Sequence, residues 1–293
     1  MTISMTARVQ QLETRQPSNQ SILTSAGWQG TIERLDRVIA DASRAYLQEL
    51  RGRGVIIDPP AWARELDRLT RGRPLDYGRP GLPFMYALRY MPRRVISLLG
   101  ALVEVSPDRL PRALTDVGSG TGATVIAAQF LSPTTEVQLT GIDASSEMVA
   151  FARHTQAGLR RPATFVENTI ASLIDAPHSV QDSELVTFSA PFDRAFGQWE
   201  HLATALDTGA VRSVLAVEPE SRAFLLDRLE QALGARGWRT RRSGSGNLPD
   251  FMKAERNLPA LTRLWRQVGA PGSYQPQTWW EPPTDDYLIA VRS

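Results

Sequence analysis

A group of glycines near the middle of the chain has the residue types and spacing of a ligand-binding turn. Residues 114–117 read as a buried strand, and Gly118, Gly120 and Gly122 follow directly before a helical segment. Such glycines permit positive φ and close approach of a ligand to the main chain, while the N–H groups that open a helix favour an anion. Asp143 closes the next predicted strand, 21 residues beyond Gly122. A carboxylate at that place suits the hydroxyls of a ribose, so we predict a nucleoside ligand with an anionic or zwitterionic arm.

Two kinds of cofactor satisfy this description. Counted as Gly118, Gly120 and Ala123, the turn fits the G-x-G-x-x-G/A pattern of dinucleotide binders, which by itself is a weak signal. Against that assignment, the turn begins after more than a hundred residues, and Asp116 stands two places before the first glycine. A carboxylate there would repel a pyrophosphate but would attract an ammonium group. The residues therefore favour a zwitterionic nucleoside over a dinucleotide.

The spacing D-x-G-x-G-x-G, followed by an acid at the end of the next strand, resembles the first two motifs of the class I S-adenosylmethionine (SAM)-dependent methyltransferases. The run Gly-Ile-Asp-Ala-Ser-Ser-Glu-Met-Val at 141–149 is similar to the way that family continues from its ribose-binding acid. The resemblance covers residues 114–217 well and the last strands plausibly, and it says nothing before residue 84. It implies an α/β fold, a doubly wound, Rossmann-like seven-stranded sheet, with SAM as the cofactor.

Carried over by position, the resemblance assigns the cofactor contacts. The turn would surround the methionine moiety, with an acid supporting its ammonium; the second acid would bind the ribose, and the residues after it would lie near the adenine. After the third strand, where the family often has an acid for the adenine amino group, this chain offers an amide or a hydroxyl. A serine ends the fourth strand, where the family places residues beside the sulfonium, and the signature N-P-P-Y is absent. The turn consists of Gly118, Ser119, Gly120 and Gly122, and the two acids are Asp116 for the ammonium and Asp143 for the ribose. Ala144 and Met148 would lie near the adenine, Asn168 or Thr169 would meet its amino group, and Ser189 ends the fourth strand.

The candidate catalytic residues are two tyrosines and a histidine. Methyl transfer depends mainly on placing the acceptor close to the methyl group and excluding water, and a base is needed only when the acceptor must first lose a proton. Tyr86 and Tyr90, at helical spacing, could face the cation with their rings, although packing of an amphipathic helix explains them equally well. His201 lies nearer the expected pocket than the other histidines, His154 and His178. The three histidines show no metal-ligand spacing, and we predict no metal.

The elements that must position these residues fall into two regions. Apolar residues spaced by three and four predict helices over 31–50, from 58 onward and over 84–105, the last broken or kinked at Pro92. Short apolar runs at 114–117, 137–142, 163–166, 185–189 and 211–217 predict strands, with helices near 123–130, 146–157, 192–205 and 221–235. Two more strands are expected at 238–242 and 287–292. We therefore predict a loose tail at 1–20, a helical lid or substrate region at 21–110, and a SAM-binding domain at 111–293.

A long insert, residues 243–286, lies between the last two predicted strands. Its first half carries a predicted helix over 258–268, and its second half is rich in Pro and aromatic residues, including Trp279 and Trp280. Long excursions in compact domains are often functional, so the insert is expected to be either a substrate lid or a satellite core. Together with the helical front region it would enclose a small substrate.

Composition sets further limits. The chain has 293 residues and no cysteine, which excludes disulfides, thiolate metal sites and a cysteine nucleophile. All but one of its 33 basic residues are arginine, and the net charge of +2 gives little attraction to phosphate, so nucleic acid is not the expected partner. The apolar stretches are too short to span a bilayer, and no signal peptide is recognisable. We expect a soluble, cytoplasmic protein with a small-molecule partner and no membrane association, its oligomeric state being open.

Three functions remain open. The first is methyl transfer to a small metabolite, of the kind found in secondary metabolism. The second keeps SAM but moves its aminocarboxypropyl arm, as in nicotianamine synthase-like enzymes or in cyclisation to azetidine-2-carboxylate; its motivation is the Tyr-x-x-x-Tyr pair and the run 221–225 after the fifth strand. The third is RNA methylation or RNA binding, because Tyr-Met-Pro-Arg-Arg at 90–94 and Val-Glu-Pro at 217–219 are similar to ribosomal small-subunit assembly methyltransferases. The cysteine cluster of that family is missing here.

Overall fold

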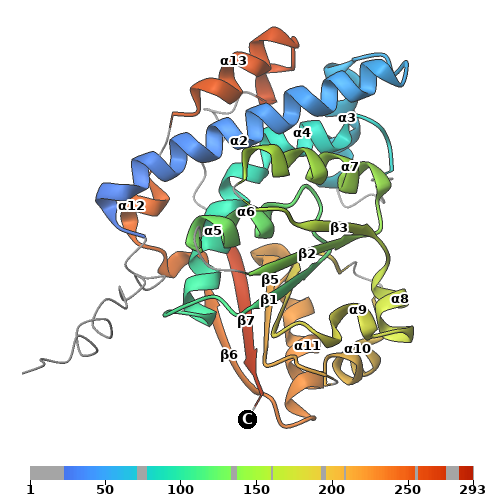
Figure 1. Ribbon diagram of the computed structural model, residues 1–293, viewed down its shortest axis with the longest axis vertical. Helices are drawn as coiled ribbons and strands as arrows, with labels where there is room; N and C mark the ends of the chain where they lie inside the picture. Colours follow the sequence, from blue (N-terminus) through green and yellow to red (C-terminus); the bar gives the residue numbers. More distant parts are fainter. Residues whose placement is uncertain are drawn as a thin grey trace, which may run out of the picture.

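A seven-stranded sheet forms the centre of the computed structural model (Figure 1). The structure describes residues 23–70, 78–132, 137–159, 161–192, 196–207, 209–254, 257–274 and 284–292. The strand order is β3-β2-β1-β4-β5-β7-β6, and the first five strands are parallel. The strands are β1 (Ala113–Val117), β2 (Gln138–Asp143), β3 (Thr164–Glu167), β4 (Leu185–Ser189), β5 (Ser213–Pro219), β6 (Arg239–Gly244) and β7 (Asp285–Val291). The predicted α/β fold with a doubly wound, Rossmann-like seven-stranded sheet is confirmed.

The last strand of the chain lies inside the sheet and not at its edge. β7 pairs antiparallel with β5 on one side and with β6 on the other. Up to β5 the order is that of a classic doubly wound sheet, in which the sixth strand would lie beside the fifth. Here β7 takes that place, and β6 becomes the edge. The amino end of β7 is thereby brought beside the carboxyl end of β5, where Asp285 pairs with Pro219.

Helices cover both faces of the sheet (Figure 1). Alternate residues of β5 show the two-sided burial, because Leu215 and Val217 belong to one apolar cluster while Val214 and Ala216 belong to the other. The first cluster includes residues of α5 (Met91–Val105), α6 (Ala123–Leu131) and α7 (Ser146–Thr155), and the second includes residues of α10 (Trp199–Leu206) and α11 (Phe224–Gly234). This is the layered arrangement expected when strands alternate with helices.

The amino-terminal region is helical, as predicted, and forms an outer layer. The helices are α2 (Ser25–Gly52), α3 (Pro59–Thr70) and α4 (Leu82–Arg89). α2 begins earlier than the predicted residue 31, because the Thr24 side chain caps it by accepting from Gly27 N at 3.2 Å. Its apolar face is buried in the same cluster as one face of the sheet, through residues such as Ile32, Leu35 and Ile39. The front helices and the sheet therefore share one core, while the division at 110 stays a prediction.

Three helix predictions need correction. The stretch 84–105 is broken, as predicted, but the break lies at Tyr90 and not at Pro92. Pro92 stands in the opening turn of α5, where a missing N–H costs nothing. The helix expected from Phe192 begins only at Trp199, because Phe192 is buried against other aromatic rings of that face. Between β3 and β4, where no helix was predicted, lie α8 (Ile170–Asp175) and α9 (His178–Gln181).

The insert packs on the front helices. It contains α12 (Asp250–Lys253) and α13 (Pro259–Gln267), the latter confirming the helix predicted over 258–268. Asp36 of α2 is buried and accepts from the main-chain nitrogens of Ala260 at 2.7 Å and Leu261 at 2.9 Å, so a side chain of α2 caps α13. Burial raises the pKa of Asp36, and these two bonds oppose that rise. Trp279 and Trp280, like the predicted tail at 1–20, lie outside the described residues.

Within the described ranges, no helix has the length and the apolar character needed to cross a membrane.

Candidate functional site

The predicted glycine turn connects β1 to α6 in the geometry that its sequence requires. Gly118, Gly120 and Gly122 have φ values of 75°, 51° and 87°, a region that other residues rarely adopt. The nitrogens of Gly118 and Ser119 both donate to the carbonyl of Ile142, at 2.7 and 2.9 Å, which ties the turn to the end of β2. The turn is therefore a fixed structure at the carboxyl edge of the sheet.

Two sides of this turn differ in the space around them. A Cβ atom at Gly118 would lie 2.3 Å from Cβ of Pro191, in the loop after β4, so a side chain is excluded there. A Cβ atom at Gly120 would meet nothing within 4 Å. The main chain at Gly120 is accordingly open, as the close approach of a ligand requires.

Asp143 lies at the turn, as its place at the end of β2 predicted. Its Oδ2 accepts from Gly120 N at 2.7 Å, and its Oδ1 accepts from Ser145 N at 2.9 Å. Burial raises the pKa of Asp143, and these two bonds act in the opposite direction. Since each carboxylate oxygen has two acceptor positions, both oxygens retain one for another donor, such as a hydroxyl.

Asp116 is the most unusual acid of the site. It is fully buried, and Thr187 of β4 donates to its Oδ1 at 2.7 Å, while its Oδ2 has no hydrogen-bond partner among the described residues. Burial raises the pKa of Asp116 to about 7, against the opposing effects of the Thr187 and Thr124 hydroxyls and of the Arg94 charge. A buried oxygen without a partner is costly, so this carboxylate is poised for a cationic or hydrogen-bond-donating group. Within the described chain, Ser119 Oγ and Thr121 Oγ1 are also buried and unpaired.

The start of α7 joins the turn to the front helices. Ser145 caps the helix by accepting from Met148 N at 3.1 Å; Met148 is buried and Ala144 is exposed. Glu147, which the sequence placed only in a family-like run, is buried. It accepts from the hydroxyl of Tyr46, which lies in α2, and from Arg53, which directly follows α2. The helix predicted to lie along the adenine is thus held by the helical front region.

The two residues proposed for the adenine amino group follow β3 directly. Asn168 N donates to the carbonyl of Asp143 at 2.9 Å, so Asn168 lies beside Asp143. The Thr169 hydroxyl caps α8 by accepting from Ser172 N at 3.0 Å, and Asn168 Oδ1 accepts from Thr169 N at 2.9 Å. Both side chains already have a structural role, and their contact with an adenine stays a prediction.

A buried arginine organises the ends of β4, β5 and β7. Arg94 of α5 donates from Nε to Ser189 Oγ at 3.1 Å, from one terminal nitrogen to Asp285 at 2.9 Å and from the other to the Val217 carbonyl at 3.0 Å. The sequence showed Arg94 only as part of a basic pair, because its partners lie up to 191 positions away. Ser189 therefore lies at the end of β4, held by a residue that sequence reasoning missed, and its place beside a sulfonium stays a prediction.

Of the three candidate catalytic residues, the structure brings the tyrosines together. Their rings are 5.2 Å apart, and both are half-buried. Burial raises the pKa of Tyr86, the charge of Arg94 opposes that rise, and the charge of Asp285 adds to it. Tyr90 lies under the guanidinium groups of Arg89 and Arg93, with centroid distances of 5.2 and 5.6 Å.

His201 has a different setting from the tyrosines. Its side chain is exposed on α10, and this side chain forms no hydrogen bond within the part of the chain that the structure describes. Its role as a base stays a prediction, without a contact that supports it. No group of three or more His, Asp or Glu side chains in the described ranges is arranged to hold a metal ion.

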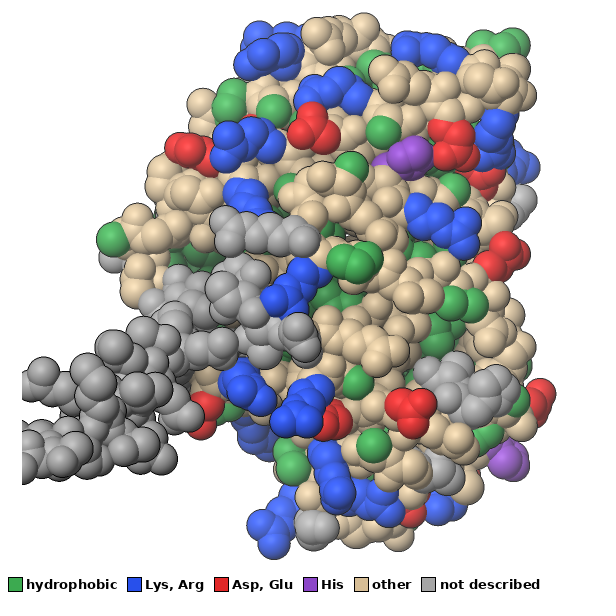
Figure 2. Space-filling model, viewed as in Figure 1, with side chains coloured by type: hydrophobic (Ala, Val, Ile, Leu, Met, Phe, Trp, Pro, Cys, Tyr) green, Lys and Arg blue, Asp and Glu red, His purple; other side chains and the backbone are tan. Residues whose placement is uncertain are grey.

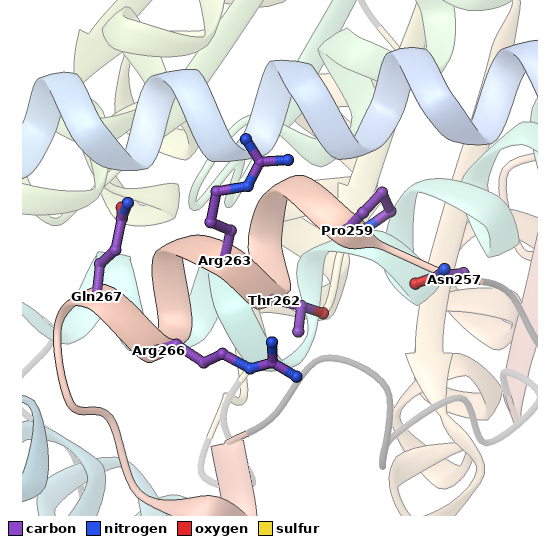
Figure 3. A pocket seen from close by; sticks show the side chains of 6 residues that line it. All are labelled: Asn257, Pro259, Thr262, Arg263, Arg266 and Gln267. Carbon is purple, nitrogen blue, oxygen red and sulfur yellow. The ribbon is translucent and has the colours of Figure 1, made fainter.

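A cavity of about 330 Å³ lies elsewhere, along α13 (Figure 3). All of its lining residues come from positions 257–267, and Figure 3 shows the Arg263 side chain directed toward α2. Because none of the turn residues lines it, this cavity is separate from the candidate site.

Two arginines of the edge strand are paired with acids, which bears on the RNA hypothesis. On the edge strand β6, Arg241 donates to Glu104 at 3.0 Å, and Arg242 contacts Glu230 at 3.0 Å as well as Asp227. Figure 2 shows both signs of charge over the face it displays. Ion pairs of this kind reduce the local positive field that attracts a phosphate backbone.

Comparison with known proteins gives similarity of fold only. No protein-family model matches the sequence, and no curated protein matches it either. Precorrin-6y C5,15-methyltransferase from Geobacter metallireducens GS-15 is 16% identical, with a TM-score of 0.42, over 68% of this chain and 86% of its own. The plantazolicin methyltransferase BpumL, in complex with a triazolic desmethylPZN analog and SAH, is 15% identical, with a TM-score of 0.44, over 90% and 99%. The [4+2]-cyclase SpnF is 15% identical, with a TM-score of 0.43, over 69% and 81%.

With identities and TM-scores this low, no ligand or reaction passes from those proteins to this chain. What the chain's own strand order and helix layers show is a doubly wound, Rossmann-like fold with a glycine turn and two acids at the carboxyl edge of its sheet.

Proposed function

We propose that this protein binds SAM at the glycine turn and transfers its methyl group to a small-molecule acceptor. One observation carries the proposal: Asp116 is fully buried, with one carboxylate oxygen unpaired, beside a turn whose main chain is open at Gly120. A buried acid in this state is stabilised by a cationic or hydrogen-bond-donating partner, and the ammonium of a zwitterionic amino acid arm is both. The phosphates of a dinucleotide would instead be repelled by Asp116, which supports SAM over that alternative.

The residues present fit the parts of SAM in turn. The amides of the turn would hold the methionine carboxylate, and Asp116 its ammonium, with Ser119 offering an unpaired hydroxyl. Asp143 retains an acceptor position on each oxygen for a ribose diol. Ala144 and Met148 would lie along the adenine, where Asn168 or Thr169 would meet its amino group, and Ser189 would lie near the sulfonium.

When bound, SAM supplies a methyl group activated by a positively charged sulfur. The contribution of the chain is to orient an acceptor and to exclude water, which lowers the entropic part of the barrier. Tyr86 and Tyr90, half-buried with their ring centroids 5.2 Å apart, are the residues we propose for this role. The front helices and the insert would close over the crevice, and this geometry favours a small acceptor.

Binding is tested first, by calorimetry with S-adenosylhomocysteine. The wild type should bind, and Asp143→Ala should weaken binding by at least about tenfold, since it removes an acceptor for both ribose hydroxyls. Asp108→Ala, at an exposed position before β1, is the matched control and should bind as the wild type does. Equal affinity of Asp143→Ala and the wild type would remove the ribose assignment.

The reaction is tested by mass spectrometry of the nucleoside product. S-adenosylhomocysteine formed only with an added acceptor supports methyl transfer. Methylthioadenosine released from SAM alone would instead establish the aminocarboxypropyl alternative. Steeply salt-dependent RNA affinity, with no turnover of small acceptors, would favour the RNA hypothesis.

A further inference from the structure

Arg222 connects the end of β5 to the loop that follows β4. It lies in a short 3₁₀ turn, Glu220–Arg222, directly after β5. Its Nε donates to Glu218 Oε2 at 2.9 Å, and one terminal nitrogen donates to the carbonyls of Phe192 at 2.7 Å and Ala190 at 3.2 Å. One guanidinium therefore holds two carbonyls of the same short loop.

The anchor of this arginine is a fully buried acid. Glu218 has no exposed surface, and its carboxylate lies 2.7 Å from a terminal nitrogen of Arg222. Burial raises the pKa of Glu218 to about 7, and the charges of Arg222 and Arg94 oppose that rise. Because a buried acid without a counter-ion is strongly unfavourable, Glu218 fixes the place of Arg222.

The loop held in this way has a strained backbone. Ala190 has a φ of 57°, which makes it the single non-glycine residue with positive φ within the described ranges. Alanine avoids this region because its Cβ crowds the neighbouring carbonyl, so the conformation persists only where the surroundings enforce it. Ala190 is held at both ends of its backbone. Its nitrogen donates to the Val217 carbonyl at 2.9 Å, and its own carbonyl accepts from Arg222.

The strained loop is packed directly on the glycine turn. Pro191, between the two carbonyls that Arg222 holds, fills the space where a Cβ of Gly118 would lie, at 2.3 Å. A shift of residues 190–192 would therefore change the wall against which the turn is packed. The contacts run without a gap from Glu218 through Arg222 and Pro191 to Gly118.

From these contacts we propose that Arg222, anchored by Glu218, is a positioning residue that holds loop 190–192 against the glycine turn and thereby sets the affinity of the turn for its nucleoside ligand. This inference rests on the proposed function for the identity of the ligand. The arrangement of the loop itself does not depend on that identity.

The test measures binding of S-adenosylhomocysteine by calorimetry to wild type and Arg222→Gln. Loss of the charge-assisted bonds should weaken binding by about tenfold or more. Arg222→Lys keeps the charge but loses the planar fork, and it should fall between the two. Arg228→Gln, at an exposed arginine of the neighbouring helix α11, is the matched control and should leave the affinity unchanged.

A rescue variant separates positioning from general destabilisation. Ala190→Gly in the Arg222→Gln background should recover part of the affinity, because glycine adopts positive φ without strain. A merely structural role of Arg222 predicts no recovery. Affinity within twofold of wild type in Arg222→Gln, or no recovery in the double variant, would overturn the inference.

Amide hydrogen exchange supplies a readout that needs no ligand. Peptides covering residues 185–192 should exchange faster in Arg222→Gln than in wild type, while those of β2 should not change. If the wild type fails to bind S-adenosylhomocysteine, the proposed function fails, but faster exchange at 185–192 would still support the loop contact. Unchanged exchange there would refute the contact whatever the ligand.

Discussion

Replacing Asp116 by asparagine should remove a defined part of the pH dependence of protein stability. Burial raises the pKa of Asp116 from 3.8 to about 7, so the folded protein keeps a proton on this group that the unfolded chain releases near pH 4. Stability therefore falls as pH rises from about 4 to 7, and the loss is complete above the folded pKa. At 1.36 kcal/mol per pKa unit, the cost of the charged form reaches at most about 4 kcal/mol.

Asparagine has nearly the same shape and can still accept from Thr187, but it does not titrate. Its amide nitrogen would occupy the place of the unpaired Oδ2 and lack a partner there, at a cost of about 1–3 kcal/mol that is independent of pH. The diagnostic quantity is thus the change with pH: Asp116→Asn should gain about 3 kcal/mol relative to wild type between pH 5 and 8.

Urea denaturation at four pH values from 5 to 8 measures this difference. Asp108→Asn, at an exposed position, supplies the baseline for the same chemical change. Parallel stability curves for Asp116→Asn and wild type would refute the assignment of a buried, uncompensated acid at this position. Ligand affinity reports on the same group: an ammonium needs the carboxylate, so binding of S-adenosylhomocysteine to wild type should weaken below pH 7, by up to about tenfold per unit.

Three further changes test the packing around the site. Gly118→Ala should abolish nucleoside binding and destabilise the fold, because the turn has no room for a Cβ there. The control is Gly234→Ala, at a helical glycine with open space, which should stabilise the protein by up to about 1 kcal/mol. Thermal unfolding of both variants measures the difference. Tyr46→Phe should cost about 1–3 kcal/mol in urea denaturation, since it removes the donor to the buried Glu147; an unchanged midpoint would show that this bond contributes nothing. Asp36→Ala should free the amino end of α13 and speed hydrogen exchange over residues 258–268, whereas retained protection would contradict its role as a cap.

Much of the fold could be predicted because it is expressed in local patterns. All seven strands were placed within a few residues. For the five parallel strands the reason is that buried strands of a parallel sheet are short apolar runs. The errors occurred where a local pattern is ambiguous. The helix expected over 192–205 begins at Trp199, and Phe192 is buried against the rings of Phe188 and Trp199, a contact that no local pattern indicates.

The residues of the candidate site were likewise predictable from the sequence only in part. The turn and its two acids could be found because positive φ requires glycine and because the end of a strand fixes where an acid lies. Glu147 was visible only as part of a family-like run, and its contact with Tyr46, 101 positions earlier, had no signal in the sequence. Arg222 was noticed only as part of a run after β5, and nothing local indicated that it holds Ala190 and Phe192.

By itself, the sequence determined the positions of the strands and of most helices along the chain, the glycine turn and the acids Asp116 and Asp143, because each depends on neighbours in the chain. Only the tertiary structure decided that β7 enters the sheet between β5 and β6, that Arg94 joins Ser189 to Asp285, and that Asp36 caps a helix 225 positions away. The physical reason is that such contacts are selected by the burial of the whole core. No periodicity within a window of sequence specifies which distant charge a buried group will meet.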